Sequence, residues 1–231
     1  MNLFYQPAIA QGTMHLDLDE SRHAVKVLRM QPGDTIHLTD GYGFLYTAFI
    51  QDANPKKCSF TISEMKEISK RNFSVAIAIA PTKNSDRTEW FVEKAIEIGI
   101  EEIYFIICKT SERKTVNMER MNKIAISAMK QSGQARLSQL HEMAPFGEMV
   151  GHTASQKFIC QVDAGNPVHL KSLAKAHSNY LVLIGPEGDF TQEEIQQATA
   201  NGFQKVSLGP NRLRTETAAI TACQILNFVN L

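Results

Sequence analysis

The sequence predicts an α/β protein with a parallel sheet, preceded by a smaller domain built mainly of strands. From about residue 75 onward, apolar runs that suit buried strands alternate with longer segments of helical periodicity, which is the pattern of a parallel sheet covered by helices. The first 66 residues instead show short strand-like runs separated by turn residues. A polar segment, KEISKRN at 66–72, separates the two patterns, so we expect domains at 1–70 and 71–231.

The amino-terminal domain is expected to be a small β-barrel. Strands are predicted at 35–39, 44–50 and 58–62, because turn-forming residues interrupt the sequence between them. One short helix, 20–28, would bring four basic side chains together, namely Arg22, His23, Lys26 and Arg29. A helix with basic residues is often only a solvated face, so the pattern alone leaves their role open.

The second domain is expected to contain five successive strand and helix pairs. The predicted pairs are 75–80 with 86–98, 103–108 with 118–131, 158–162 with 168–175, 181–184 with 192–200, and 203–208 with 215–229. Thr191 and Glu194 have the spacing of a capping box that opens the fourth helix, and Gly202 ends it.

Two glycine-bearing loops follow the last two predicted strands. In open α/β sheets, ligands bind at the carboxyl ends of the strands, and glycine lets the backbone approach a ligand closely. The spacing excludes both a dinucleotide fingerprint and a P-loop. An isolated Gly-Pro-x-Gly is more often an ordinary turn, but Arg212, Arg214 and Glu216 crowd the start of an apolar helix, where charges need water or a ligand.

These loops resemble the carboxyl-terminal signature of the SPOUT superfamily, and in particular the bacterial RsmE-type methyltransferases that modify a uridine of small-subunit ribosomal RNA. The similar segments, in family order, are HAVKVLRM (23–30), EWFVEKAIEIGI (89–100), SER (111–113), AMKQSGQAR (128–136), LIGPEGDF (183–190) and SLGPNRLRTETA (207–218). The resemblance covers nearly the whole chain. It implies a SPOUT-type parallel sheet with a C-terminal trefoil knot, where periodicity alone would suggest an unknotted chain, and an N-terminal PUA-like RNA-binding β-barrel.

The resemblance also implies a cofactor and a set of site residues. S-adenosyl-L-methionine would be bound by Leu183, Gly185, Glu187, Gly188, Leu208, Gly209 and Leu213. Methylation of a uracil N3 requires loss of its proton, so a base or a stabilising cation is needed. Arg214 is assigned to the substrate base or phosphate, and Glu216 to proton removal or to orienting that arginine. A plain ion pair between the two is the competing interpretation.

RNA contact is expected at Arg22, His23, Lys26, Arg29, Arg113 and Arg136, since arginine can hold phosphate through its planar fork. Solubility of the surface is the alternative for any one of them. Three positions depart from the family pattern. Lys130 and Gln134 stand where Glu and Arg are common, and Asp189 stands where the first loop usually has glycine. Asp189 is expected to alter the start of the following helix more than ligand binding.

Composition limits the remaining possibilities. The formal net charge is zero, so affinity for RNA must come from local patches. The four cysteines are scattered and the histidines lack metal-site spacing, so we expect no disulfide and no metal. The longest apolar run is too short to span a bilayer and no signal peptide is apparent, which indicates a cytoplasmic protein with no membrane partner. The resemblance implies a homodimer, and the apolar face of the last helix could be core or interface.

The predicted function is therefore methylation of N3 of a uridine in 16S ribosomal RNA, with free RNA or the assembled small ribosomal subunit as the substrate. Two alternatives remain open. The enzyme could act on another RNA position, such as a ribose 2′-hydroxyl or a transfer RNA base. The chain could also be a non-catalytic RNA-binding factor in ribosome assembly, although intact GPEG and LRTETA segments argue against it.

Overall fold

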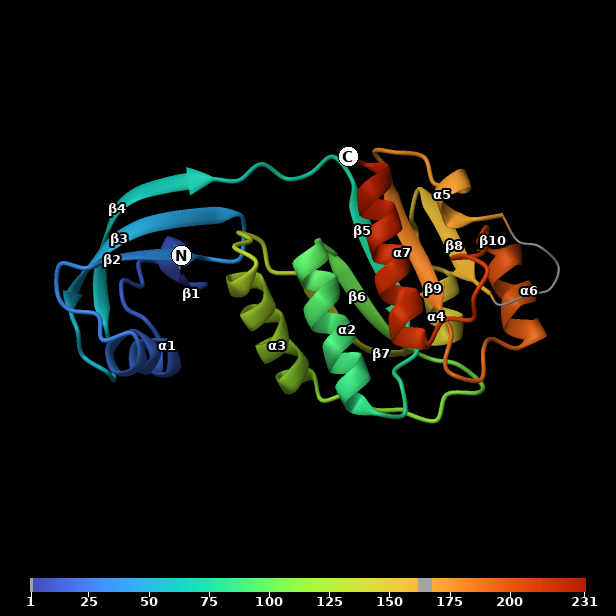
Figure 1. Ribbon diagram of the computed structural model, residues 1–231, viewed down its shortest axis with the longest axis horizontal. Coiled ribbons are helices and arrows are strands. Elements are labelled where there is room, and N and C mark those ends of the chain that lie inside the picture. Colours follow the sequence, from blue (N-terminus) through green and yellow to red (C-terminus); the bar gives the residue numbers. More distant parts are fainter. Residues whose placement is uncertain (1, 162–167) are drawn as a thin grey trace. The chain divides into compact units, whose positions relative to one another are not determined.

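The structure, a computed structural model, describes residues 2–161 and 168–231 (Figure 1). It divides into two compact units. The first comprises Met1–Lys70 and Ile126–Leu137, and the second comprises Arg71–Ala125 and Ser138–Leu231. The sequence did not indicate that 126–137 belong with the amino-terminal unit, because this segment continues a helix that begins in the other unit.

The first unit is built on a four-stranded sheet. Its strands are β1 (Leu3–Tyr5), β2 (Thr35–Thr39), β3 (Phe44–Asp52) and β4 (Ser59–Glu67), in that spatial order. β1 pairs with β2 in parallel, and the other neighbours are antiparallel. The three strands predicted from the sequence all form, whereas β1 and the short helical turn η1 (Ile9–Gln11) have only three residues each and show no periodicity. Buried side chains such as Phe4, Leu38 and Phe60 form the core of this unit.

A short helical segment connects β1 and β2 in the first unit. α1 (Leu18–Arg22) begins at Asp17, whose carboxylate accepts a hydrogen bond from the Glu20 amide at 2.7 Å. It continues directly into η2 (His23–Val27), a π-helical turn. The single helix predicted at 20–28 is therefore two segments of different winding. Single π-helical turns occur frequently at functional sites, which directs attention to the exposed basic residues of this segment.

The second unit contains the predicted parallel sheet. Its strands are β5 (Ser74–Ile79), β6 (Glu102–Ile107), β7 (Gln139–Pro145), β8 (Gln156–Cys160), β9 (Asn179–Ile184) and β10 (Gln204–Val206). The spatial order is β10-β8-β9-β5-β6-β7, and every neighbouring pair is parallel. The central strands β5 and β9 are buried on both faces, which explains their unbroken apolar sequences.

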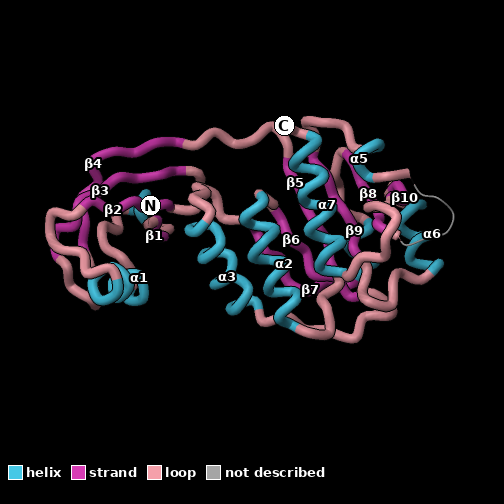
Figure 2. The backbone as a smooth tube through the Cα atoms, viewed as in Figure 1, coloured by secondary structure: helices cyan, strands magenta, loops and turns pink. Residues whose placement is uncertain are grey.

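Helices cover both faces of this sheet (Figures 1 and 2). On one face, α2 (Ser85–Ile98) packs against α7 (Thr215–Val229), and α7 lies on β5 and β9. On the other face, α4 (Phe146–Val150) and α6 (Gln192–Ala200) pack together over side chains such as Leu181 and Leu183. The remaining helices are α3 (Met118–Gln131) and α5 (Leu170–Leu173). No helix in the described part of the chain is long and apolar enough to cross a bilayer.

Several helix ends lie where the sequence predicted them. The bounds of α6 and α7 match the expected 192–200 and 215–229. The capping box is present, because the Thr191 hydroxyl accepts the Glu194 amide at 3.3 Å and the Glu194 carboxylate accepts the Thr191 amide at 2.8 Å. These ends are set by contacts between neighbours in the sequence, which is why they were readable without the fold.

Other elements differ from the prediction. β7 and α4 were not predicted, because β7 is a half-exposed edge strand and α4 has only five residues. The helix expected at 168–175 shortens to α5. Val162, the last residue of a predicted strand, lies outside the described residues. Each difference concerns a short or irregular element, where periodicity carries little information.

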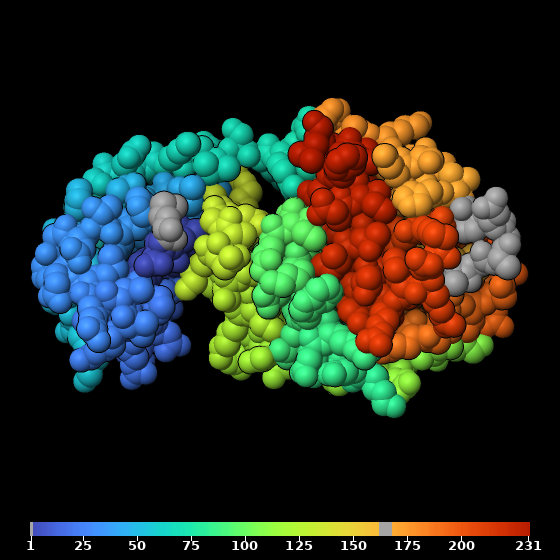
Figure 3. Space-filling view, in the orientation of Figure 1, coloured from blue at the N-terminus to red at the C-terminus, as the bar shows by residue number. Residues whose placement is uncertain are grey.

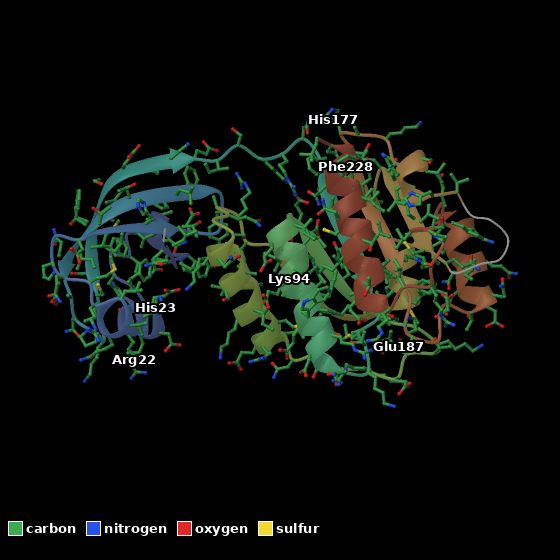
Figure 4. All side chains as sticks on the ribbon, in the orientation of Figure 1. Arg22, His23, Lys94, His177, Glu187 and Phe228 are labelled. Atoms are coloured by element: carbon green, nitrogen blue, oxygen red, sulfur yellow. The ribbon has the colours of Figure 1, made fainter. Side chains whose placement is uncertain are left out.

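Helix α7 contacts the sheet near both ends of the central strands. At its start, the Thr215 hydroxyl donates to the Gly185 carbonyl at 3.1 Å, just after β9. Near its other end, Asn227 accepts a hydrogen bond from the Arg71 guanidinium at 2.7 Å, and Asn230 accepts one from the His177 amide at 2.6 Å. Figure 4 shows Phe228 and His177 at this second end, while Glu187 lies near the first. The helix therefore fixes the loop after β9 while it is itself anchored at the opposite edge of the sheet.

Candidate functional site

A pocket of about 900 Å³ lies at the carboxyl edge of the parallel sheet in the second unit. Its walls come from the ends of β8, β9 and β10, the loops after β9 and β10, the start of α7 and one residue of α2. Parallel strands bring their carboxyl ends to one edge, so loops that are far apart in the sequence meet here. A cavity of this size suits a small organic ligand or cofactor.

Glycines shape the two loops that form most of the wall. A Cβ atom at Gly185 would lie 3.2 Å from the ring of Phe190 and 3.3 Å from its backbone nitrogen, so a side chain there would require Phe190 to shift slightly. Gly209 has a φ of +131°, which L side chains rarely adopt. Both glycines line the pocket. They leave backbone amides and carbonyls exposed where a ligand can reach them.

The loop after β9 is held by hydrogen bonds from neighbouring segments. The Glu187 carboxylate accepts the Lys83 amide at 2.9 Å, and the Thr110 hydroxyl donates to the Asp189 carbonyl at 2.8 Å. Gly188 approaches Thr110 so closely that an added Cβ would lie 3.2 Å from its side chain. The loop therefore has a defined conformation set by two other loops of the same unit.

The structure brings together most of the residues assigned to the cofactor. The pocket is lined by Gly185, Glu187, Leu208, Gly209 and Leu213. Leu183 is instead buried in the core on the α4 and α6 face, and Gly188 packs beside Thr110; neither lines the pocket. Their assignment to cofactor binding stays a prediction.

The two candidate catalytic residues have different surroundings. Arg214 precedes α7 at its N-cap position, is exposed and lines the pocket, and its guanidinium makes no hydrogen bond or ion pair with another described residue. Glu216 is 7% exposed and does not line the pocket. Its carboxylate lies 3.8 Å from Nε of Arg87, so its ion-pair partner is Arg87 rather than Arg214.

Arg87 is a pocket residue that the sequence did not single out. It belongs to the first turn of α2, which follows the carboxyl end of β5. Because β5 pairs with β9 up to Ile79 and Ile184, the segment after β5 reaches the same edge as the glycine loops. His169 is a second such residue; its ring nitrogen Nδ1 accepts the Lys171 amide at 3.2 Å at the start of α5.

Asp189 also lines the pocket, and the expectation that it affects the start of α6 more than ligand binding stays a prediction. That helix is capped by Thr191, and the Asp189 carboxylate instead accepts the adjacent Phe190 amide at 2.8 Å. Cys160 lies in the same wall, where burial, and secondarily the charge of Asp189, raises the pKa of its thiol above the ordinary value. A neutral, buried thiol is a poor nucleophile, so this cysteine acts as a small apolar group.

A second, smaller pocket of about 470 Å³ lies in the first unit. It is lined by Asp19, Arg22, His23, Lys26, Val27, Pro55 and Lys56. Figure 4 shows Arg22 and His23 next to each other on the α1 and η2 segment. Lys56, from the loop between β3 and β4, was not predicted to join them. Arg29 is exposed but is not part of this lining.

The other two predicted RNA contacts are engaged in hydrogen bonds to backbone carbonyls. Arg113 donates to Thr82 at 2.9 Å and to Lys83 at 2.6 Å, and thereby supports the segment that holds Glu187. Arg136 donates to the Tyr42 and Ile68 carbonyls within the first unit. Both guanidinium groups thus stabilise the backbone of their own unit, and their contact with RNA stays a prediction.

Two of the positions that depart from the family pattern, Lys130 in α3 and Gln134 in the loop after it, are also bonded within the first unit. Lys130 forms an ion pair with Glu20, and the Gln134 amide donates to the Ser132 hydroxyl at 3.0 Å. Among the described residues, no cluster of three or more His, Cys, Asp or Glu side chains has a geometry that could hold a metal ion.

Comparison with known proteins matches two family models to this chain. A model described as an RNA methyltransferase domain matches residues 69–227, and one described as an RNA methyltransferase PUA domain matches residues 16–63. The chain is also 28% identical over 215 residues to the ribosomal RNA small subunit methyltransferase E of Rickettsia conorii, with 90% of this chain and 87% of that protein covered.

Solved structures agree with these matches. A protein from Porphyromonas gingivalis, described as a probable rRNA-methyltransferase, is 40% identical with a TM-score of 0.94, over 100% of this chain and 98% of that one. A ribosomal RNA small subunit methyltransferase E from Neisseria gonorrhoeae, bound to S-adenosyl methionine, is 26% identical with a TM-score of 0.88 over the same shares.

Proposed function

Since this chain belongs to the RNA methyltransferase family, with relatives named ribosomal RNA small subunit methyltransferase E, we propose that it transfers a methyl group from S-adenosyl-L-methionine to N3 of one uridine in 16S ribosomal RNA. The observation that carries the proposal is the pocket at the sheet edge, where glycine loops and an unpaired arginine meet. Membership of the family supports RNA methylation, and the choice of a uridine N3 rests on the sequence resemblance.

The glycine loops supply the cofactor site. The backbone groups of Gly185, Leu208 and Gly209, together with the side chain of Leu213, would hold the adenosine part in the pocket. When bound, S-adenosyl-L-methionine supplies an electrophilic methyl group on a cationic sulfur, so the protein contributes binding, alignment and electrostatics. Alignment of the acceptor behind the methyl carbon can contribute roughly 7 to 11 kcal/mol.

The arginines at the pocket supply the electrostatics. A uracil N3 gives its proton to solvent as it forms the bond to the methyl carbon, and the negative charge left on the ring is shared with the neighbouring oxygens until the transfer is complete. Arg214 is exposed and unpaired at the pocket, so it is placed to stabilise this charge. Arg87 contributes a second cation whose orientation is set by Glu216. Glu216 is then a positioning residue, since it lies behind Arg87 and outside the pocket lining.

Glu216→Gln is expected to lower kcat by roughly 3- to 10-fold and to leave the shape of the pH–rate profile unchanged, because an uncharged side chain of similar size orients Arg87 less well. Glu89→Gln is the matched control. Glu89 lies in α2, as Arg87 does, and this substitution removes the ion-pair partner of Arg120 in α3. Loss of the ascending limb of the profile in Glu216→Gln would instead identify Glu216 as the base.

The first unit would hold the RNA through its basic pocket. Replacing Arg22, Lys26 and Lys56 together by Ala is expected to weaken RNA binding about 10-fold at moderate salt, and to reduce the slope of log K against log salt by roughly 0.7 for each lost phosphate contact. Lys57, Lys66 and Lys70, which are exposed cations of the same unit outside the pocket, form the control triple. Equal effects of both triples would show that only the total charge matters.

Other parts of the proposal concern architecture. We place the domain boundaries at 1–70 and 71–231, a division supported by the family matches at 16–63 and 69–227, with the segment 126–137 of the second domain packing in the first compact unit. The first domain would close as a PUA-like barrel, and α7 would pass through a loop as a trefoil knot. The chain would act as a cytoplasmic homodimer. Support for the dimer comes from the outer side of α7, which is uncovered in Figure 3, and from Phe228, which is 57% exposed.

The test is transfer of labelled methyl groups from S-adenosyl-L-methionine to unmodified small ribosomal subunits and to protein-free RNA, followed by identification of the labelled nucleoside. Label in 3-methyluridine is expected, and the better of the two substrates shows whether the enzyme acts on the assembled subunit. Label in a 2′-O-methylated nucleoside or in transfer RNA would overturn the assigned position. Absence of both label and cofactor binding would indicate a non-catalytic RNA-binding protein.

A further inference from the structure

Asp189 has an unusual backbone conformation at the wall of the pocket. Its φ is +62°, in the left-handed region that favours glycine. Of the described residues other than glycine, Arg29 and His177 share a positive φ, but neither lines this pocket. A side chain kept at such a position carries a conformational cost, and such residues concentrate at functional sites.

The surrounding hydrogen bonds fix Asp189 and leave part of its carboxylate available. Its amide donates to the Pro186 carbonyl at 2.9 Å, and its carbonyl accepts the Thr110 hydroxyl. Oδ1 accepts the Phe190 amide at 2.8 Å, while Oδ2 makes no hydrogen bond with another described residue. The charge is thus held in one place by the loop, with one oxygen open to a ligand.

The charge of Asp189 acts within the pocket. Cys160, the last residue of β8, also lines the pocket, and the negative charge of Asp189 adds to burial in disfavouring its thiolate. Asp189 and Cys160 both line the pocket, so the Asp189 carboxylate belongs to a wall of this cavity. Glu187, the other carboxylate in the lining, is exposed and accepts the Lys83 amide, so it serves the conformation of the loop.

The other charges in the lining create a need for this carboxylate. Arg87, Arg212 and Arg214 all line the pocket. Their combined positive potential favours anionic groups and opposes a ligand that carries positive charge. A carboxylate held inside the pocket would therefore strengthen the binding of a cationic cofactor. Asp189 lines the pocket, and the hydrogen bonds of its loop hold it there.

We propose that Asp189 binds the cationic sulfonium end of S-adenosyl-L-methionine and makes the pocket prefer this cofactor to its uncharged-sulfur product, S-adenosylhomocysteine. This inference rests on the proposed function. Discrimination by charge has a direct benefit, because the product differs from the cofactor only by the methyl group and its positive charge. A carboxylate beside the sulfur favours binding before transfer and release after it.

The test is isothermal titration of the full chain with three ligands: S-adenosyl-L-methionine, S-adenosylhomocysteine, and sinefungin, in which a carbon bearing an ammonium group replaces the methylated sulfur. Asp189→Asn keeps the acceptor for the Phe190 amide and tolerates the left-handed backbone, so it removes mainly the charge. It is expected to weaken both cationic ligands about 10-fold and S-adenosylhomocysteine less than 2-fold. Glu148→Gln, an exposed carboxylate of α4 outside the pocket, should change none of the three.

Other results would overturn the proposal. Equal weakening of all three ligands would mean that Asp189 contacts a part that they share, and unchanged binding with a lower kcat would mean that it acts on the RNA. Asp189→Gly, which relieves the backbone, should repeat the selectivity of Asp189→Asn if the charge is responsible. Failure of the unsubstituted protein to bind any of the three would overturn the proposed function itself, a result distinct from binding without charge selectivity.

Discussion

Replacing Arg214 by Ala is expected to lower the rate of methyl transfer by about 100- to 1000-fold while the protein remains folded. The guanidinium is exposed at the pocket and contributes no hydrogen bond to another described residue, so its removal costs the fold little. The loss should appear in kcat under saturating cofactor, since the charge it stabilises develops only as the uracil proton leaves. Labelled methyl incorporation into RNA measures the rate, and circular dichroism checks the fold.

Arg120→Ala provides the comparison for that experiment. Arg120 is also an exposed arginine of the second unit. Its guanidinium lies 2.8 Å from the Glu89 carboxylate, and neither residue lines the pocket. Its loss should leave turnover within about 2-fold of the unsubstituted protein, because exposed ion pairs contribute little. A folded Arg214→Ala variant with full turnover would show that the catalytic assignment is wrong.

Gly209→Ala is expected to lower cofactor affinity by about 10-fold or more and the free energy of unfolding by roughly 1 to 2 kcal/mol. A φ of +131° is strained for any L side chain, so the loop after β10 must change its conformation, and this loop forms a wall of the pocket. Calorimetric titration with S-adenosyl-L-methionine gives the affinity, and urea unfolding gives the stability.

Gly202→Ala separates these two effects. Gly202 has a φ of +86°, with nothing near its Cβ position, and it does not line the pocket. It should lose stability in the same way but keep its cofactor affinity. If both variants bound the cofactor equally well, the loop after β10 would not be part of the cofactor site.

The parts of the fold set by near neighbours in the sequence were predictable. The capping box at Thr191 fixed the start of α6, and the buried strands β5 and β9 appeared as unbroken apolar runs. The glycine loops could be placed at one edge because parallel strands share a direction. In contrast, β7 pairs at the margin of the sheet and is half exposed, so its sequence carries a weak signal.

The site required knowledge of which strands are neighbours. Arg87 reaches the pocket only because β5 lies next to β9, two strands that are about a hundred residues apart in the sequence. For the same reason, the sequence did not indicate the ion pair between Glu216 and Arg87. It suggested Arg214 as the partner of Glu216, because these two residues are close in the sequence. Arg113 was predicted to contact RNA, and the sequence did not indicate that its guanidinium also donates to the backbone carbonyls of Thr82 and Lys83. The presence of a charged residue in a loop does not show whether its side chain binds a ligand or donates hydrogen bonds to the backbone.

The anchoring of α7 at both edges of the sheet has a consequence for how the protein is made. The pocket wall from 207 to 215 and the anchors at Asn227 and Asn230 all follow the rest of the sheet in the sequence. A ribosome delivers these residues after β5, β8 and β9 have already emerged, so a nascent chain without α7 has strands but no complete pocket. Pairing between such distant segments is slow to form. The pocket is therefore complete only after α7 has been made and has packed on the sheet, and a nascent chain that lacks α7 has no complete cofactor site.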